Sequence, residues 1–286
     1  MRVGFIGIGL MGLPMAQKLV EAGIELVAYN RTPEKLEPLG GVKIAQQPAD
    51  AIIGSDCIML MLTNASAICS LLLSEDAKPH LAGKTVIQMS TIAPNESMAI
   101  AQEVIAAGGE YLEAPVLGSI PEAQSGKLIV MVGGTEAHFE RWRDLLQNFG
   151  TEILLIGEVG SASAIKLALN QLIASLSTAF ALSLGFLERQ GASVDIFMQI
   201  LRQSALYAPT FDKKLPRMRD RNYSHPNFPT KHLLKDTELF INAAQGEGMN
   251  ISSIEGVKKI LEIAITSGFA DADYSSLFSA IARDIS

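Results

Sequence analysis

The feature that most constrains the fold is a glycine-rich hexapeptide that directly follows an apolar stretch at the N-terminus. Its spacing is GxGxxG, over Gly7, Ile8, Gly9, Leu10, Met11 and Gly12. Residues 2–6 (RVGFI) before it are typical of a buried strand, and Pro14 and Gly23 fit the start and end of a following helix. In a strand–turn–helix unit such glycines permit a tight turn and close backbone approach to a pyrophosphate. The hexapeptide therefore predicts a dinucleotide-binding domain.

The first 160 residues alternate β-branched runs with helical stretches, which predicts an α/β Rossmann domain with a parallel sheet over residues 1–160. The strands are expected at 2–6, 25–29, 57–62, 85–89, near 111–112, 128–133 and 152–156. From Ser161 onward the pattern becomes helical, with one helix of about 28 residues and then shorter helices broken near Gly191, at Pro209 and across 226–229. We therefore expect an all-α second domain over residues 161–286.

Composition and charge limit the classes of partner. The 286 residues are 48% hydrophobic, with a net charge of −7. This balance argues against a broad basic surface for nucleic acid, which requires clustered Lys and Arg. No signal-peptide pattern precedes the first strand. Both cysteines, Cys57 and Cys69, are expected to be reduced core residues. We expect a cytoplasmic protein that acts on a small molecule.

One long uncharged stretch needs a separate interpretation. Residues 167–187 lack charged side chains and are long enough to cross a bilayer. They nevertheless contain polar residues such as Asn170 and Gln171, and Lys166 and Glu188 flank them directly. We interpret this stretch as a helix buried between domains or subunits, with no membrane partner. A homodimer or homotetramer is the expected assembly.

The residues after the second strand indicate which dinucleotide is bound. A site that prefers NAD usually carries Asp or Glu there, to accept a hydrogen bond from the ribose 2′-hydroxyl. This chain has Asn30, Arg31 and Thr32 instead. Without a carboxylate to repel a 2′-phosphate, and with a guanidinium able to bind one, the sequence favours NADP. The alternative is that Arg31 is a solvated turn residue.

Lys166 is the strongest catalytic candidate in the helical half. Reduction of a carbonyl needs a group that supplies a proton to the oxygen. Lys166 lies in an apolar helix, and Asn170 follows on the same face. Two such polar residues are costly to bury without a role, although a lysine at a helix start can also reach solvent with its amine. The four histidines show no ligand spacing, so no metal is expected.

Five motifs, in order over the whole chain, resemble the β-hydroxyacid dehydrogenase family. They are GFIGIGLMGLPMA (4–16), MSTIAP (89–94), EAPVLGS (113–119), GSASAIKLALN (160–170) and FPTKHLLKDTEL (228–239). This family includes 3-hydroxyisobutyrate dehydrogenases, tartronate semialdehyde reductases and glyoxylate/succinic semialdehyde reductases. The resemblance implies a Rossmann domain, an all-helical domain and an active site between them. Asn30-Arg31-Thr32 and residues 113–116 look most like the glyoxylate/succinic semialdehyde reductase branch.

The resemblance also implies residue roles. Lys166 matches the family's general acid/base, and Asn170 matches an asparagine that binds the substrate. Thr91 would lie near the nicotinamide, and Lys235 would help to hold the cofactor. The remaining positions are a cofactor loop at Leu62 and Thr63, and Phe228 and Asp236 where the helical domain closes over the site. The implied function is NADPH-dependent reduction of small carboxylated aldehydes to hydroxy acids, or the reverse oxidation of 3-hydroxyacids.

The chain departs from the branch pattern at Leu117, where the family has a serine that contacts the substrate carboxylate. Leu117 cannot donate a hydrogen bond. We therefore expect only the N–H groups of Gly118 and Ser119 and the Ser119 hydroxyl to remain available. The loss of one charge-assisted hydrogen bond would weaken binding of a carboxylate by roughly 10- to 100-fold.

Other functions stay open on the sequence. Leu117 mildly favours a less acidic carbonyl or an imine as substrate, although imine reductases usually lack the lysine at position 166. A non-catalytic NADP-binding module is a further alternative. A 6-phosphogluconate dehydrogenase is disfavoured, because the helical half is too short for that family.

Overall fold

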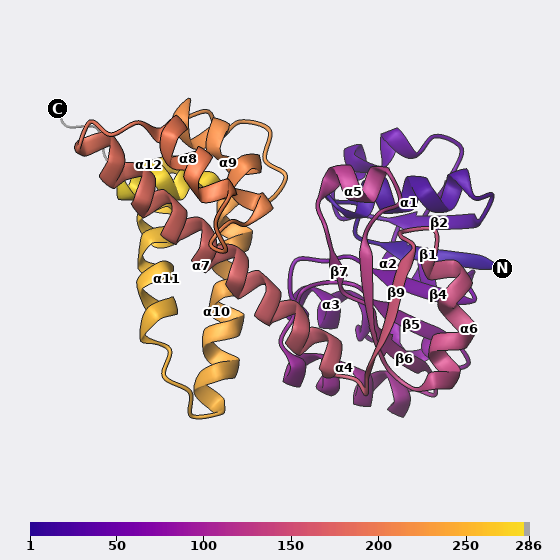
Figure 1. The fold of residues 1–286 in the computed structure, drawn as a ribbon. Coiled ribbons are helices and arrows are strands. Elements are labelled where there is room, and N and C mark those ends of the chain that lie inside the picture. The colour runs from indigo at the N-terminus through magenta and orange to yellow at the C-terminus, as the bar shows by residue number, and fades with distance from the viewer. Residues whose placement is uncertain (283–286) are drawn as a thin grey trace. The chain divides into compact units, whose positions relative to one another are not determined.

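The computed structural model describes residues 1–282 and divides into two compact units, Met1–Leu167 and Ala168–Ser286. The division falls inside one long helix. Figure 1 shows the elements of both units.

The first unit is built on a nine-stranded sheet in the order β3-β2-β1-β4-β5-β6-β8-β7, with β9 paired to β8. The strands are β1 (Arg2–Ile6), β2 (Glu25–Tyr29), β3 (Lys43–Ile44), β4 (Cys57–Leu60), β5 (Thr85–Gln88), β6 (Glu110–Glu113), β7 (Val116–Leu117), β8 (Ile129–Gly133) and β9 (Glu152–Gly157). The first six strands pair in parallel. The sequence predicted a parallel sheet, but β8 runs antiparallel to both β6 and β7. The two-residue strands β3 and β7 were not predicted, since neither is long enough to show a period-2 pattern.

Helices cover both faces of this sheet (Figure 1). One core cluster joins Val3 and Phe5 of β1 to α1 (Gly12–Glu21), α5 (Ile120–Gln124) and α6 (Glu136–Leu146). The other joins Ile6 to α2 (Pro48–Ile53), α3 (Ala65–Leu72) and α4 (Pro94–Ala106). Successive side chains of a strand point to opposite faces, so β1, β2, β4, β5 and β6 each contribute to both clusters. Packing on both faces of the sheet holds the carboxyl ends of these strands in place, and the predicted cofactor residues follow those ends.

The second unit is helical. It contains most of α7 (Ser161–Arg189), then α8 (Val194–Arg202), α9 (Pro209–Arg219), α10 (Thr230–Gly246), α11 (Ser252–Ala264) and α12 (Leu277–Ile281). Its core includes Phe180 of α7, which stacks on Phe211 of α9 at 4.6 Å between ring centroids. The 29-residue α7 begins at the residue where the sequence predicted a long helix.

A buried ion pair joins α9 to the turn before α12. Lys214 Nζ donates to both carboxylate oxygens of Asp273, at 2.8 and 2.9 Å, and lies 4.0 Å from the centre of the Tyr274 ring. Burial lowers the pKa of Lys214. Burial alone would raise the pKa of Asp273, but the Lys214 ammonium holds that pKa below its usual value. This pair was not predicted from the sequence, because its members lie 59 residues apart.

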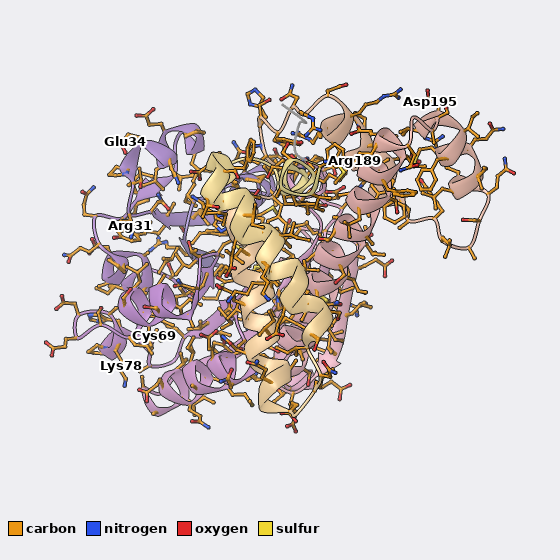
Figure 2. All side chains as sticks on the ribbon, turned by 90° about the vertical axis from the view of Figure 1, so that its left-hand side faces the viewer. Arg31, Glu34, Cys69, Lys78, Arg189 and Asp195 are labelled. Atoms are coloured by element: carbon orange, nitrogen blue, oxygen red, sulfur yellow. The ribbon has the colours of Figure 1, made fainter. Side chains whose placement is uncertain are left out.

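The two cysteines, both predicted to be core residues, differ in burial. Cys57 is buried, and burial raises the pKa of its thiol to about 12. Cys69 was wrongly predicted to be a core residue, since it is exposed on α3 (Figure 2).

The helix α7 is long and apolar enough to cross a membrane, with a mean hydropathy of 1.5 over the most apolar window, 44% of which is buried.

Candidate dinucleotide and carbonyl-reduction site

The predicted cofactor residues follow four neighbouring parallel strands. The hexapeptide Gly7–Gly12 follows β1, Asn30–Thr32 follows β2, Leu62 and Thr63 follow β4, and Thr91 follows β5. The carboxyl ends of parallel strands meet at one edge of the sheet. The strand order reverses between β1 and β4, since β2 and β3 lie on one side and β5 and β6 on the other. A dinucleotide binds at such a switch point in doubly wound sheets.

The three glycines of the hexapeptide serve different purposes. Gly7 has a φ of +108°, and a Cβ there would lie 2.3 Å from the Met61 carbonyl oxygen. A Cβ on Gly12 would lie 1.9 Å from the Gly7 carbonyl oxygen. Gly9 is different, because a Cβ there would meet nothing within 4 Å. Protein packing does not require glycine at position 9, whereas close approach of a pyrophosphate does.

The start of α1 suits an anion. No side chain caps this N-terminus, and its first turn contains no acidic residue. The N–H groups of a first helical turn and the helix dipole favour a phosphate there. With the open space above Gly9, this end of the helix fits the pyrophosphate of a dinucleotide.

Asn30 holds the glycine-rich loop in place. Its Oδ1 accepts a hydrogen bond from the Ile8 N–H at 3.0 Å, and its Nδ2 donates to the Thr32 carbonyl oxygen at 2.9 Å. The amide therefore joins the loop after β1 to the loop after β2. The sequence predicted Asn30 as a cofactor contact, and the structure adds this positioning role.

Arg31 is exposed at the same loop and is labelled in Figure 2. Among residues 1–282 it makes no hydrogen bond or ion pair. An exposed guanidinium that no protein carboxylate engages can bind a phosphate in a bidentate manner. The residues present thus fit a dinucleotide, including one with a 2′-phosphate.

A serine that the sequence analysis missed joins the other two cofactor loops. The buried Ser90 Oγ accepts a hydrogen bond from the Leu62 N–H at 2.7 Å, and the Ser90 N–H donates to Gln88 Oε1. Thr63, directly after Leu62, is exposed, and Thr91, directly after Ser90, is half-buried. Its position between the end of β5 and Thr91 is the sequence signal that could have identified Ser90 as part of the site.

Lys166 and Asn170 lie four residues apart on α7, and both are buried. Asn170 Nδ2 donates to Asp236 Oδ2 of α10 at 2.6 Å, and Lys235 Nζ pairs with Asp236 Oδ1 at 2.8 Å. A carboxylate only accepts hydrogen bonds, so this contact fixes which way the Asn170 amide faces. Asn170 Oδ1 is buried and has no hydrogen-bond partner within residues 1–282. Such an acceptor calls for a donor from a ligand.

The structure therefore brings Asn170, Lys235 and Asp236 together within the second unit. Phe228 lies before α10, half-buried, with its ring edge-on to Tyr274 at 5.9 Å. Charged residues in the first turns of a helix are usually solvated. Asp236 is instead only 3% exposed.

The loop between β7 and α5 differs from expectation at Ser119. The Ser119 N–H donates to Glu122 Oε2 at 2.8 Å, and the Ser119 hydroxyl donates to the same oxygen at 2.6 Å. The expectation that both donors remain available for a substrate carboxylate is therefore wrong in this structure. Glu122 lies three residues after Ser119, as in a capping box, and this spacing could have been read from the sequence. Leu117 is half-buried beside this loop, paired with Ile129 of β8.

Two protein families match successive parts of the chain. Residues 2–157 match the family described as the NAD binding domain of 6-phosphogluconate dehydrogenase. Residues 160–281 match that described as NAD-binding of NADP-dependent 3-hydroxyisobutyrate dehydrogenase.

Similar proteins cover nearly the whole chain. The 2-hydroxy-3-oxopropionate reductase of Escherichia coli is 33% identical, over 98% of this chain and 97% of its own length. Glyoxylate/succinic semialdehyde reductase 1 of Arabidopsis thaliana is 30% identical, over 98% of each chain. Among solved structures, the Mycobacterium tuberculosis 3-hydroxyisobutyrate dehydrogenase with L-serine has a TM-score of 0.89 at 22% identity, covering 99% of each chain.

Proposed function

The chain belongs to the β-hydroxyacid dehydrogenase family of oxidoreductases, and from this premise we propose an NADPH-dependent reductase of small carboxylated aldehydes. Glyoxylate and succinic semialdehyde are the first candidate substrates, since relatives about 30% identical carry those names. The reverse reaction would oxidise 3-hydroxyacids. The observation that carries the proposal is the pair of buried polar side chains, Lys166 and Asn170, on one face of α7.

The chemistry needs a proton at the carbonyl oxygen. When bound, the reduced nicotinamide supplies a hydride to the carbonyl carbon. Lys166 Nζ gives a proton to the oxygen, which becomes the product hydroxyl, and takes it back in the reverse direction. Asn170 Oδ1, held in orientation by Asp236, accepts a hydrogen bond from that hydroxyl.

The cofactor preference rests on Arg31. We propose that its guanidinium binds the 2′-phosphate of NADP, because it is exposed and no carboxylate of the described residues engages it. Gly9 and the start of α1 would hold the pyrophosphate, and Asn30 would keep that loop in position.

The experiment that tests the proposal is a substrate panel. NADPH and NADH oxidation would be followed with glyoxylate, succinic semialdehyde, tartronate semialdehyde, methylmalonate semialdehyde and a cyclic imine. We expect turnover with at least one carboxylated aldehyde and faster turnover with NADPH. Turnover of the imine alone would favour an imine reductase. Binding of NADPH without turnover of any member would favour a non-catalytic NADP-binding module.

A second candidate function, reduction of a less acidic carbonyl, is favoured by one observation. Both donors of Ser119 are engaged by Glu122, and Leu117 adds an apolar side chain to the same loop. A carboxylate near Ser119 would meet the charge of Glu122 rather than open donors. A neutral substrate would meet no such repulsion.

A further inference from the structure

The buried carboxylate of Glu113 ends strand β6 and has no part in the chemistry described above. It is fully buried and accepts five hydrogen bonds. Oε1 accepts from the N–H groups of Gly160, Ala162 and Ser163, at 2.8, 2.8 and 3.0 Å. Oε2 accepts from the hydroxyls of Ser97 and Ser163. A buried charge is tolerated when donors of this kind surround it.

These bonds complete the first turn of α7. The N–H of Ser161 donates to the Glu158 carbonyl oxygen, and the N–H of Ala164 donates to that of Gly160. Glu113 takes the two N–H groups between them, so no donor of the first turn is left over. Gly160 has a φ of +102° and no side chain, so it cannot provide a local cap. The cap comes instead from a residue 47 positions earlier in the chain.

The residue that caps α7, Glu113, lies at the carboxyl end of β6, and the position of this end is important. Strand β6 is parallel to β5, so Glu113 lies at the same edge of the sheet as the dinucleotide loops. Lys166 follows Ser163 by three residues and Ala162 by four, so it lies one turn above the capped N–H groups on the same side of the helix. All these residues belong to the first unit. The carboxylate thus ties the start of the lysine-bearing helix directly to the edge that holds the cofactor.

We propose that Glu113 is a positioning residue, which fixes Lys166 relative to the nicotinamide by anchoring the first turn of α7 to the end of β6. This inference rests on the proposed function of Lys166. It predicts that disturbing Glu113 lowers kcat while leaving NADPH binding almost unchanged. A merely structural cap would lower the unfolding temperature without changing kcat at a temperature where every variant is folded.

Three variants disturb the carboxylate in different ways. Glu113→Gln keeps an acceptor for the three N–H groups but removes the charge, and Glu113→Ala removes both. Gly133→Ala leaves Glu113 chemically intact but displaces it, because a Cβ at Gly133 would lie 2.5 Å from Glu113 Oε1. The φ of Gly133 is not positive, so alanine imposes no backbone strain there. Glu110→Gln is the matched control, at the other end of β6, where the carboxylate accepts from Thr85 and Arg141.

The test combines kinetics with amide hydrogen exchange over residues 159–168. We expect kcat to fall at least tenfold in Glu113→Gln and Gly133→Ala, and further in Glu113→Ala, with the Kd for NADPH within twofold of wild type. Exchange of the first turn of α7 should rise at least tenfold in the same variants and not in Glu110→Gln. If Glu113→Ala does not fold, the other two variants carry the test.

The inference is overturned if Glu113→Gln and Gly133→Ala keep kcat within twofold of wild type, or if kcat falls equally in Glu110→Gln. It is also overturned if kcat falls while exchange of the first turn is unchanged. Failure of the proposed function would show differently. Lys166→Ala would then retain wild-type turnover, whatever the exchange of the first turn in the Glu113 variants.

Discussion

At the scale of single residues, the choice of dinucleotide depends on Arg31. In the proposed function its guanidinium makes charge-assisted hydrogen bonds to the 2′-phosphate, each of which contributes about 1.5–3 kcal/mol. We expect Arg31→Ala to raise the KM for NADPH by roughly 10- to 100-fold and to leave the KM for NADH unchanged. Arg143→Ala, on the outer surface of α6, is the control. Equal changes with both dinucleotides would contradict this role.

Substrate choice at the same scale depends on Leu117 and Glu122. The matched substrates are succinic semialdehyde and butanal, which differ in the carboxylate. We expect Leu117→Ser to add a donor, and Glu122→Ala to free both donors of Ser119 and remove a like charge. Each should raise the ratio of kcat/KM for succinic semialdehyde to that for butanal by about tenfold. Glu75→Ala, which removes an equal charge from the surface, should not. An unchanged ratio in both variants would remove this account of the loop.

The sequence predicted residue types better than residue partners. The GxGxxG spacing and Lys166 with Asn170 were visible because local spacing carries their meaning. The bond from Asn170 to Asp236 joins residues 66 positions apart, and the cap from Glu113 to Gly160 joins residues 47 apart. The periodicity of apolar residues in a sequence does not predict contacts between residues so far apart. Cys69 was misplaced because an apolar helix pattern does not say which face is covered.

At the scale of elements, the buried pair Lys214 and Asp273 holds α9 to the turn before α12. Replacing only one partner would leave the other charge buried and unpaired. We expect Lys214→Met to lower the free energy of unfolding by about 3–5 kcal/mol in urea titrations. The double variant Lys214→Met, Asp273→Asn should recover part of this loss, and the exposed Lys259→Met should change it by less than about 0.5 kcal/mol. If Lys214→Met also lowered the free energy of unfolding by less than about 0.5 kcal/mol, the proposed stabilising role of the pair would be contradicted.

The same pair predicts an acid dependence of stability. The pKa of Asp273 is lower in the folded chain than in the unfolded chain, where it is about 3.9. Its contribution to stability is therefore present above pH 4 and is lost as the pH falls through the folded pKa. Lys214 stays protonated throughout this acid range in both states and adds no slope. The difference in unfolding free energy between wild type and Asp273→Asn should be constant from pH 7 to pH 5 and shrink below about pH 4. A difference independent of pH would contradict the ionised pair.

Most of the element order was also predictable. The strands of the first unit were found because buried parallel strands form continuous apolar runs, and α7 because its apolar pattern lacks a break. The antiparallel edge was not predictable, since direction depends on how residues 114–128 turn the chain. The two-residue strands β3 and β7 exist only through their partners.

At the scale of the whole molecule, the two matched families cover residues 2–157 and 160–281, and together they define an oxidoreductase that binds a nicotinamide dinucleotide. The compact units divide at Leu167, one residue after Lys166. The candidate catalytic lysine thus belongs to the unit with the dinucleotide loops, whereas Asn170, Lys235 and Asp236 belong to the helical unit.

The central claim, that Lys166 supplies the proton in an NADPH-dependent reduction, is tested most directly by the Lys166→Ala variant. With the best aldehyde of the panel at saturation, we expect kcat to fall by about 10²- to 10⁴-fold, the range typical for loss of a general acid. The Kd for NADPH, measured by its fluorescence on binding, should remain within twofold of wild type. Turnover close to the wild-type rate in Lys166→Ala would contradict the mechanism.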